Sequence, residues 1–270
     1  MGGTPMTSER PLHRVIFDLH GVLMFRAPEV AAGLPAGEVV AALRGRGLTI
    51  SFVTNSSTVG PRHIRDILVK EGIAASEAEC ASAGMAMARY LRTHYLGARI
   101  FLVGAPGLRQ ILEESLGSAA FCQPEEAADV LVVGRDAGLT AERLAEVSRI
   151  GKNAVVLATS REMTIPDAHG QLQAGPGVTV ERVEEATGGR VLVIGKPNPY
   201  ILREVLGLSS ADLSATLIVG DSPNCDLALG QAAGAATALL STTYAVTQAT
   251  FQIERLDQLL SIPNLPGSRR

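Results

Sequence analysis

The chain has 270 residues, of which 46% are apolar and 19% are charged, and its formal net charge is −3. This composition excludes an intrinsically disordered chain. The slight excess of acidic residues argues against a basic surface that binds nucleic acid and against a polybasic segment that binds a membrane. The length allows one large domain or two domains of modest size.

The three cysteines lie far apart, at Cys80, Cys122 and Cys225, without a CxxC pair. This spacing excludes a disulfide framework and a zinc knuckle and is typical of a reducing compartment. The residues before Val15 include no apolar segment of the kind found in a secretion signal. Residues 227–253 carry no charge, but their many Ala, Gly, Thr and Ser residues favour a buried helix, a strand and a loop in a protein core over a membrane span. We therefore predict a soluble, cytoplasmic protein.

Short β-branched runs recur along the chain and end in Gly, Asp or Asn. They predict strands within residues 15–21, 48–57, 98–107, 129–136, 153–160, 191–197 and 215–221. Helical patterns lie between most of these runs, at residues 61–72, 108–117, 140–151, 200–208 and 225–234. Alternating strand and helix signals predict an α/β fold with parallel sheets.

Polar residues stand at the C-terminal ends of the predicted strands. Asp18, Thr54, Lys196 and Asp221 each lie at, or directly after, the end of an apolar run. In open α/β sheets, ligands bind at this edge because strand ends and helix N-termini converge there. The sequence therefore predicts one common site built from these strand ends.

In chain order, the strand ends read VIFDLHGVL, SFVTNSS, VIGKPNPY and IVGDSPNCDLALG. Together they resemble the four motifs of the haloacid dehalogenase superfamily of phosphohydrolases. The stretch VVGRDAGLTAERL, followed by LATSREMTIPDAHGQLQAGPG, is similar to the cap of subclass IIA, the branch that is 4-nitrophenylphosphatase-like. The resemblance covers essentially the whole chain.

The resemblance implies a Rossmann-like parallel-sheet core with an inserted α/β cap domain. The core is expected to comprise residues 1–78 and 190–270, and the cap residues 79–189. Because the stretch between Asp18 and Thr54 is too short for a cap, the insert lies between the second and third motifs. Family members that cleave carbon–phosphorus or carbon–halogen bonds have their cap directly after the first motif, so the resemblance disfavours those reactions.

The family's reaction implies hydrolysis of a small phosphoric monoester through an aspartyl-phosphate, with Asp18 as the nucleophile. A dianionic phosphate beside a carboxylate needs its charge offset, which implies Mg²⁺ as the cofactor. The implied metal ligands are Asp18, Asp221 and the main-chain carbonyl of His20. Thr54 and Asn55 would bind the transferring phosphoryl oxygens.

Lys196 would offset the charge of both Asp18 and the phosphate. The chain has only three lysines, so the presence of one at the end of an apolar strand favours a functional role for it. Asp226 would lie behind the reacting groups, where it would orient Lys196 or metal-bound water.

The sequence departs from the family pattern at His20, where the family has the second aspartate of Asp-x-Asp. That aspartate protonates the leaving oxygen and then activates water. An imidazole is a competent acid and base near neutrality, so one hypothesis keeps the phosphatase and gives His20 this role. The alternative is a catalytically impaired relative that binds a phosphorylated ligand without efficient turnover.

The cap sequence bears on the substrate at Ser160, Arg161 and Glu162, which follow a threonine where the branch often reads Asn-Pro-Asp. Arg161 could pair with a second anionic group, and Glu162 could accept hydrogen bonds from hydroxyl groups; a solvated surface loop is the competing interpretation. The expected partner is a small phosphorylated metabolite, with no nucleic acid and no membrane. Caps of this branch often mediate dimers, which leaves a homodimer through the cap open.

Overall fold

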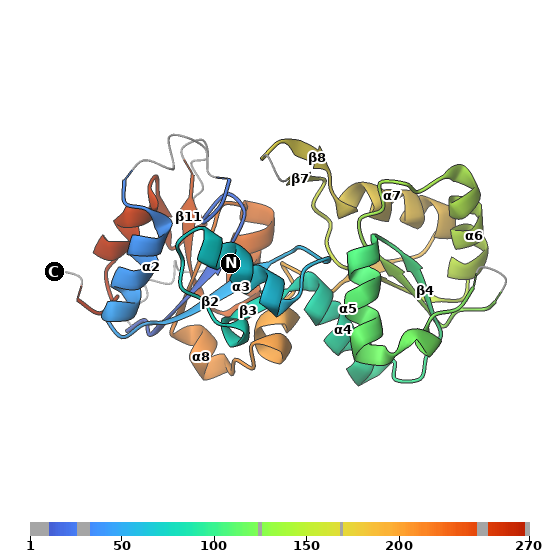
Figure 1. The fold of residues 1–270 in the computed structure, drawn as a ribbon, viewed down its shortest axis with the longest axis horizontal. Helices are drawn as coiled ribbons and strands as arrows, with labels where there is room; N and C mark the ends of the chain where they lie inside the picture. Colours follow the sequence, from blue (N-terminus) through green and yellow to red (C-terminus); the bar gives the residue numbers. More distant parts are fainter. Residues whose placement is uncertain (1–10, 26–32, 124–125, 168–169, 242–247, 268–270) are drawn as a thin grey trace, which may run out of the picture. The chain divides into compact units, whose positions relative to one another are not determined.

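The structure, a computed structural model, describes residues 11–25, 33–123, 126–167, 170–241 and 248–267. Its contacts divide the chain into two compact units (Figure 1). The first unit consists of Met1–Thr54, Pro61–Ala81 and Lys196–Arg270, and the second of Asn55–Gly60 and Ser82–Gly195. Each unit contains a parallel sheet, which confirms the predicted α/β class with an inserted second domain.

The unit boundaries differ from the expected ones by a few residues, and Asn55–Gly60 packs with the second unit. The backbone N–H of Gly84 donates to the carbonyl of Ser56 at 3.4 Å, and the hydroxyl of Ser82 donates to the carbonyl of Val59 at 2.8 Å. These bonds join segments that are distant in sequence, so the local pattern could not assign this loop to the insert.

The first unit is built on a six-stranded sheet with the strand order β12-β11-β10-β1-β2-β3. The strands are β1 (Arg14–Asp18), β2 (Thr49–Thr54), β3 (Cys80–Ser82), β10 (Thr216–Gly220), β11 (Ala236–Leu240) and β12 (Phe251–Ile253). β1, β2 and β10 lie at the centre and are almost wholly buried. Strands buried on both faces read as continuous apolar runs, which is why the sequence showed them so clearly.

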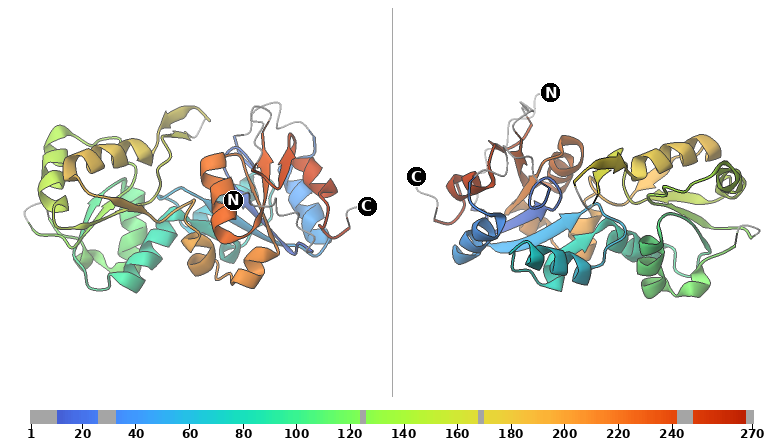
Figure 2. Two further views of the ribbon diagram at one scale, coloured as in Figure 1. Left: turned by 180° about the vertical axis from the view of Figure 1, so that it is seen from behind. Right: turned by 45° about the horizontal axis from the view of Figure 1, so that its top comes forward.

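Helices cover both faces of this sheet (Figures 1 and 2). They are α2 (Ala36–Gly45), α3 (Pro61–Lys70), α8 (Ser210–Ser214), α9 (Ala228–Ala233), the π-helical turns η3 (Ile201–Val205) and η4 (Pro223–Leu227), and the 3₁₀ turns η1 (Glu77–Glu79) and η5 (Leu256–Ser261). The chain moves from β1 through β2 to β3 in one direction and from β10 to β11 in the other. Right-handed crossovers therefore place α2 and α3 on one face and α9 on the opposite face.

The second unit has a four-stranded parallel sheet with the order β4-β5-β6-β9 and a separate antiparallel hairpin. The sheet strands are β4 (Ile100–Val103), β5 (Val130–Val133), β6 (Val155–Ala158) and β9 (Val191–Val193), and the hairpin strands are β7 (Thr164–Pro166) and β8 (Leu172–Ala174). The helices are α4 (Ala83–His94), α5 (Pro106–Leu116), α6 (Ala141–Gly151) and α7 (Pro176–Thr187), with a short turn η2 (Ser118–Ala120).

An apolar core covers one face of this second sheet. Alternate residues of the strands, among them Phe101, Leu131 and Val133, pack with Val147 of α6 and Val180 of α7. Since successive side chains of a strand point to opposite faces, these strand residues share one face of the sheet.

The predicted helices begin close to where the structure places them. α6 starts after Thr140, whose side chain accepts a hydrogen bond from the N–H of Arg143, an N-cap that the sequence shows directly. The pattern at residues 200–208 instead forms the π-helical turn η3, and the pattern at 225–234 divides into η4 and α9. The hairpin β7–β8 and the strand β3 were not predicted, and residues 227–253, where one strand is expected, contain both β11 and β12.

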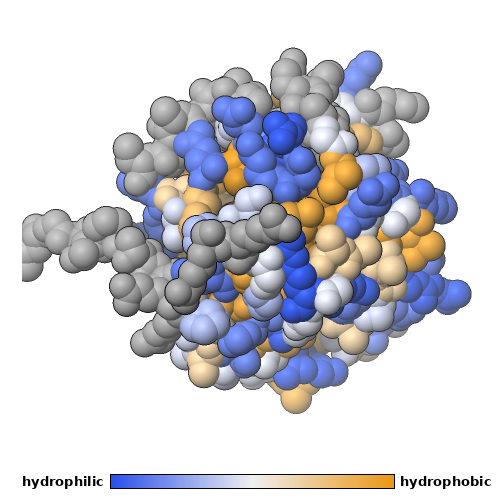
Figure 3. Space-filling view, turned by 90° about the vertical axis from the view of Figure 1, so that its left-hand side faces the viewer, coloured by the Kyte–Doolittle hydropathy of each residue, from blue (hydrophilic) through white to orange (hydrophobic). Residues whose placement is uncertain are grey.

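One face of the first unit carries hydrophilic side chains with apolar patches between them (Figure 3). Among the described residues, no helix has both the length and the hydropathy that a membrane span needs.

Candidate active site

Three central strands of the first unit end at the same edge of the sheet. β1 ends at Asp18, which pairs with Val53 of β2. Val53 directly precedes Thr54, the last residue of β2. On its other side β1 pairs with β10, which ends at Gly220, directly before Asp221. The structure therefore brings Asp18, Thr54 and Asp221 to one edge, where the sequence placed them.

Lys196 joins two buried carboxylates at this edge. Its Nζ donates to Oδ1 of Asp18 at 2.6 Å and to Oδ1 of Asp226 at 2.7 Å. The Lys196 side chain is 3% exposed, and those of Asp18 and Asp226 are 9% and 2% exposed. The backbone N–H of Ser222 donates to the second oxygen of Asp226 at 3.1 Å, which fixes this carboxylate behind the lysine.

The cluster carries an excess of negative charge. Asp18, Asp221 and Asp226 offer carboxylate oxygens that lie within 4.8 Å of one another, and Lys196 is the ammonium group bonded to two of them. Burial raises the pKa of Asp18 well above its ordinary value; Lys196 opposes this shift, and the other two carboxylates add to it. A set of carboxylate oxygens that is largely buried and carries excess negative charge fits a hard divalent cation.

Gly21 allows the turn after β1 to approach Asp221. Its φ is +78°, in the left-handed region that favours glycine, and a Cβ there would overlap with the carboxylate of Asp221. The glycine of the first motif thus makes room for an acid of the fourth.

Replacing Gly21 with alanine is expected to lower kcat for the expected hydrolysis of a phosphoric monoester by at least about tenfold. The reason is that the added methyl group displaces Asp221 by steric overlap. Gly72→Ala is the matched control. Its φ of +75° imposes a similar backbone strain, but no atom lies within 4 Å of the added Cβ. Steady-state kinetics, with thermal unfolding of both variants, separates the two effects; equal kcat values would contradict the proposed contact.

His20 lies in the turn after β1 and is partly exposed. Its ring stacks on Phe25, with ring centroids 5.7 Å apart and 11° between the planes. Burial, and then the charge of Lys196, lower the pKa of the imidazole below its ordinary value. Within the described parts of the chain no hydrogen bond occupies the ring, so both of its nitrogens are available for proton transfer.

The other predicted residues lie in the second unit. The amide Nδ2 of Asn55 donates to the hydroxyl of Ser160 at 3.3 Å. Arg161 forms a two-pronged ion pair with Glu184 of α7, in which one bond measures 2.8 Å. Glu162 accepts a hydrogen bond from Ser160 at 3.0 Å. Both cap candidates are therefore engaged by groups of their own unit.

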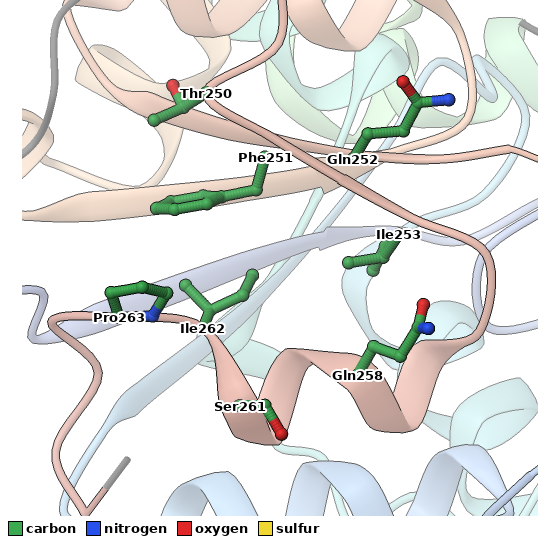
Figure 4. A pocket seen from close by; sticks show the side chains of 8 residues that line it. All are labelled: Thr250, Phe251, Gln252, Ile253, Gln258, Ser261, Ile262 and Pro263. Carbon is green, nitrogen blue, oxygen red and sulfur yellow. The ribbon is translucent and has the colours of Figure 1, made fainter. Parts of the chain in front are cut away.

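A pocket of about 640 Å³ lies between β12 and η5 of the first unit (Figure 4). Its lining contains no ionisable side chain and none of the predicted site residues; it consists of Thr250, Phe251, Gln252, Ile253, Gln258, Ser261, Ile262 and Pro263. It has no part in the acid–base chemistry described above.

Comparison with known proteins gives the family. Residues 15–116 match the pattern of haloacid dehalogenase-like hydrolases, and residues 193–254 match a related HAD-hydrolase-like pattern. The chain is 33% identical over 208 residues to the 5′-nucleotidase YutF of Bacillus subtilis (strain 168), an alignment that covers 77% of this chain and 79% of that protein. The chain belongs to the haloacid dehalogenase-like hydrolases.

Other relatives in this family are phosphatases. An acid sugar phosphatase of Staphylococcus saprophyticus is 29% identical over 216 residues, covering 80% of this chain and 81% of that protein. The crystal structure of a putative p-nitrophenyl phosphatase from Bacillus subtilis has a TM-score of 0.77 at 30% identity, covering 97% of this chain and 99% of that chain. The crystal structure of a double mutant of a thermostable NPPase from Geobacillus stearothermophilus has a TM-score of 0.78 at 29% identity. The match covers 92% of this chain and 98% of that chain. The predicted superfamily and branch are confirmed, and the chain is a phosphoric monoester hydrolase of this family.

Three features of the site were not predicted from the sequence: the contact of Gly21 with Asp221, the stacking of Phe25 on His20, and the bonds of Ser160. Gly21 was visible in the sequence as part of the first motif, directly before Val22 and Leu23, but its contact with Asp221 was not. Phe25 has a φ of +52°, which no sequence signal indicates for a phenylalanine.

Proposed function

We propose that the chain is a Mg²⁺-dependent phosphatase that hydrolyses a small phosphoric monoester through an aspartyl-phosphate on Asp18. The observation that carries this proposal is the buried cluster in which Lys196 lies between Asp18 and Asp226, with Asp221 nearby. By donating to Asp18, Lys196 favours the ionised carboxylate that a nucleophile requires, against the burial that raises the pKa of this group.

Asp18, Asp221 and the main-chain carbonyl of His20 are the groups proposed to hold Mg²⁺. Two carboxylates and a carbonyl are oxygen ligands of the kind that Mg²⁺ takes, and the uncompensated charge of the cluster favours a divalent ion. When bound, the ion would offset the repulsion between a phosphate and the carboxylates.

In the proposed reaction an oxygen of Asp18 bonds to phosphorus while the bond from phosphorus to the leaving oxygen breaks. His20 gives a proton to that oxygen, and its neutral ring then takes a proton from the water that cleaves the aspartyl-phosphate. Lys196 stabilises the charge on the transferred group, and Thr54 and Asn55 donate hydrogen bonds to it. Asp226 holds Lys196 in place.

The substrate is proposed to be a small phosphorylated metabolite. The names of the relatives include a 5′-nucleotidase, acid sugar phosphatases and p-nitrophenyl phosphatases, so nucleotides, sugar phosphates and aryl phosphates are the classes to compare. The cytoplasmic location and the homodimer through the second unit stay predictions. All three cysteines lie among the described residues, and their thiols, two of them buried, are in no disulfide, which supports a reducing compartment.

The alternative, a protein that binds a phosphorylated ligand without efficient turnover, rests on His20 alone. One experiment decides between them: phosphate release from 4-nitrophenyl phosphate and from a panel of phosphorylated metabolites, measured with Mg²⁺ and with EDTA. Turnover that EDTA abolishes and Mg²⁺ restores would support the phosphatase. Binding of phosphorylated ligands without turnover of any panel member would support the alternative.

Replacing His20 with alanine is expected to lower kcat for a sugar phosphate by about a hundredfold, the usual contribution of a general acid or base. The loss with 4-nitrophenyl phosphate is expected to be smaller, because nitrophenolate is a stable anion that leaves without a proton. His20→Asp, which restores the family residue, serves as the control and should retain turnover of both substrates. Equal losses of the alanine variant on both substrates would contradict proton donation by His20.

A further inference from the structure

A chain of hydrogen bonds inside the second unit links Asn55 to Glu162 through one buried hydroxyl group. Asn55 Nδ2 donates to Ser160 Oγ at 3.3 Å, and Ser160 Oγ donates to Glu162 Oε2 at 3.0 Å. The backbone N–H of Glu162 donates to the same Oγ at 3.1 Å. Ser160 is fully buried and Asn55 is 7% exposed, so water does not compete for these bonds.

The carboxylate of Glu162 determines the donor–acceptor direction of these hydrogen bonds. A carboxylate only accepts hydrogen bonds, so the single hydroxyl hydrogen of Ser160 is committed to Glu162. The two lone pairs of Ser160 Oγ then accept from the N–H of Glu162 and from Asn55. If the Asn55 amide were turned over, its oxygen would face a lone pair of Ser160 and one buried bond would be lost.

The opposite side of the amide is also enclosed. A Cβ built on Gly195 would lie 2.8 Å from Oδ1 of Asn55 and 2.9 Å from Cβ of Ala83. Oδ1 thus packs directly against the backbone of Gly195, where no side chain fits. Asn55 directly follows Thr54 in the chain, and Gly195 directly precedes Lys196. The contact between Asn55 and Gly195 therefore joins the chain neighbours of two motif residues, Thr54 and Lys196.

We propose that Ser160 and Glu162 are positioning residues of the phosphatase, which fix the orientation of the Asn55 amide. The inference rests on the proposed function, in which Asn55 binds the phosphorylated substrate. It gives Glu162 a role behind Asn55 in place of the direct substrate contact expected from the sequence. In this order, Glu162 orients the hydroxyl group of Ser160, and Ser160 orients the amide of Asn55.

Kinetics of single and double variants tests this order. Ser160→Ala and Glu162→Ala are each expected to lower kcat/KM for 4-nitrophenyl phosphate by about threefold to tenfold, the loss of one buried hydrogen bond. The double variant should be no worse than Ser160→Ala, because Glu162 acts through Ser160. Glu162→Gln should stay within about twofold of the wild type, since its amide oxygen can still accept from Ser160.

Glu185→Ala is the matched control, because it removes an exposed carboxylate from the same unit without touching Ser160. Additive losses in the double variant, or wild-type activity of Ser160→Ala, would overturn the inference. Thermal unfolding of each variant identifies any loss that comes from misfolding.

A second readout does not depend on turnover. The side-chain amide resonances of Asn55, assigned by their absence in Asn55→Ser, should move and exchange faster with solvent in Ser160→Ala and Glu162→Ala. They should stay in place in Glu162→Gln. Unchanged resonances in Ser160→Ala would overturn the inference, whereas a wild-type protein that releases no phosphate would overturn the proposed function alone.

Discussion

Replacing Asp18 with asparagine is expected to lower kcat for 4-nitrophenyl phosphate by at least about a thousandfold. The carboxylate oxygen that would bond to phosphorus is lost, and one of the proposed ligands of Mg²⁺ is lost with it. Asparagine keeps the size of the side chain, and its amide oxygen can still accept the hydrogen bond from Lys196 that Asp18 accepts at 2.6 Å. The variant is therefore expected to fold.

Steady-state kinetics at saturating Mg²⁺ measures this loss, and Asp66→Asn is the control. Asp66 forms an ion pair with Arg65 in which its side chain is 50% exposed, and such surface pairs contribute little to stability. Its substitution should leave kcat unchanged. Mass spectrometry of acid-quenched wild-type enzyme should further show a phosphate adduct on the peptide that contains Asp18. An adduct on another peptide, or an Asp18→Asn variant with more than about a hundredth of the wild-type kcat, would contradict the assigned nucleophile.

Replacing Lys196 with methionine is expected to lower the free energy of unfolding by about 3–5 kcal/mol and to abolish turnover. The substitution leaves Asp18 and Asp226 buried and facing each other without the ammonium group that bonds to both. Removing one partner of a buried ion pair is costly because the remaining charge has neither water nor a counter-ion. Urea unfolding followed by circular dichroism, in the presence of EDTA, measures the change without a contribution from bound metal.

Two further variants sharpen this experiment. Lys152→Met removes an exposed lysine and should change the free energy of unfolding by less than about 0.5 kcal/mol. The double variant Lys196→Met/Asp226→Asn removes one of the two unpaired carboxylates and should recover part of the stability but none of the activity. A single Lys196→Met variant as stable as Lys152→Met would contradict the ion pairs described above.

The location of the site could be predicted because its residues follow buried strands. Asp18, Thr54 and Asp221 each come at the end of an apolar run, and parallel strands end at one edge of a sheet. The strand signals are strong because β1, β2 and β10 are buried on both faces. The role of Asp226 beside Lys196 came from the family resemblance, and the structure places the two in contact at 2.7 Å.

The second unit shows where prediction from the sequence ended. The choice of Arg161 and Glu162 as substrate contacts came from their charge and their place in the cap, but charge does not identify a partner. In the folded chain Arg161 pairs with Glu184 and Glu162 holds Ser160. Both partners come from the same unit, and Glu184 is 23 residues away in sequence.

The sequence by itself therefore determined the α/β class, the order of the motifs and the identity of the polar residues at one edge of the first unit's sheet. Local periodicity and the ends of apolar runs encode these features, because they depend on which residues are buried in each element. The tertiary structure alone decided that Gly21 makes room for Asp221, that Asn55 belongs to the second unit, and that Ser160 faces Asn55. Ser160 and Asn55 are 105 residues apart, and only the packing of the folded chain brings such residues together.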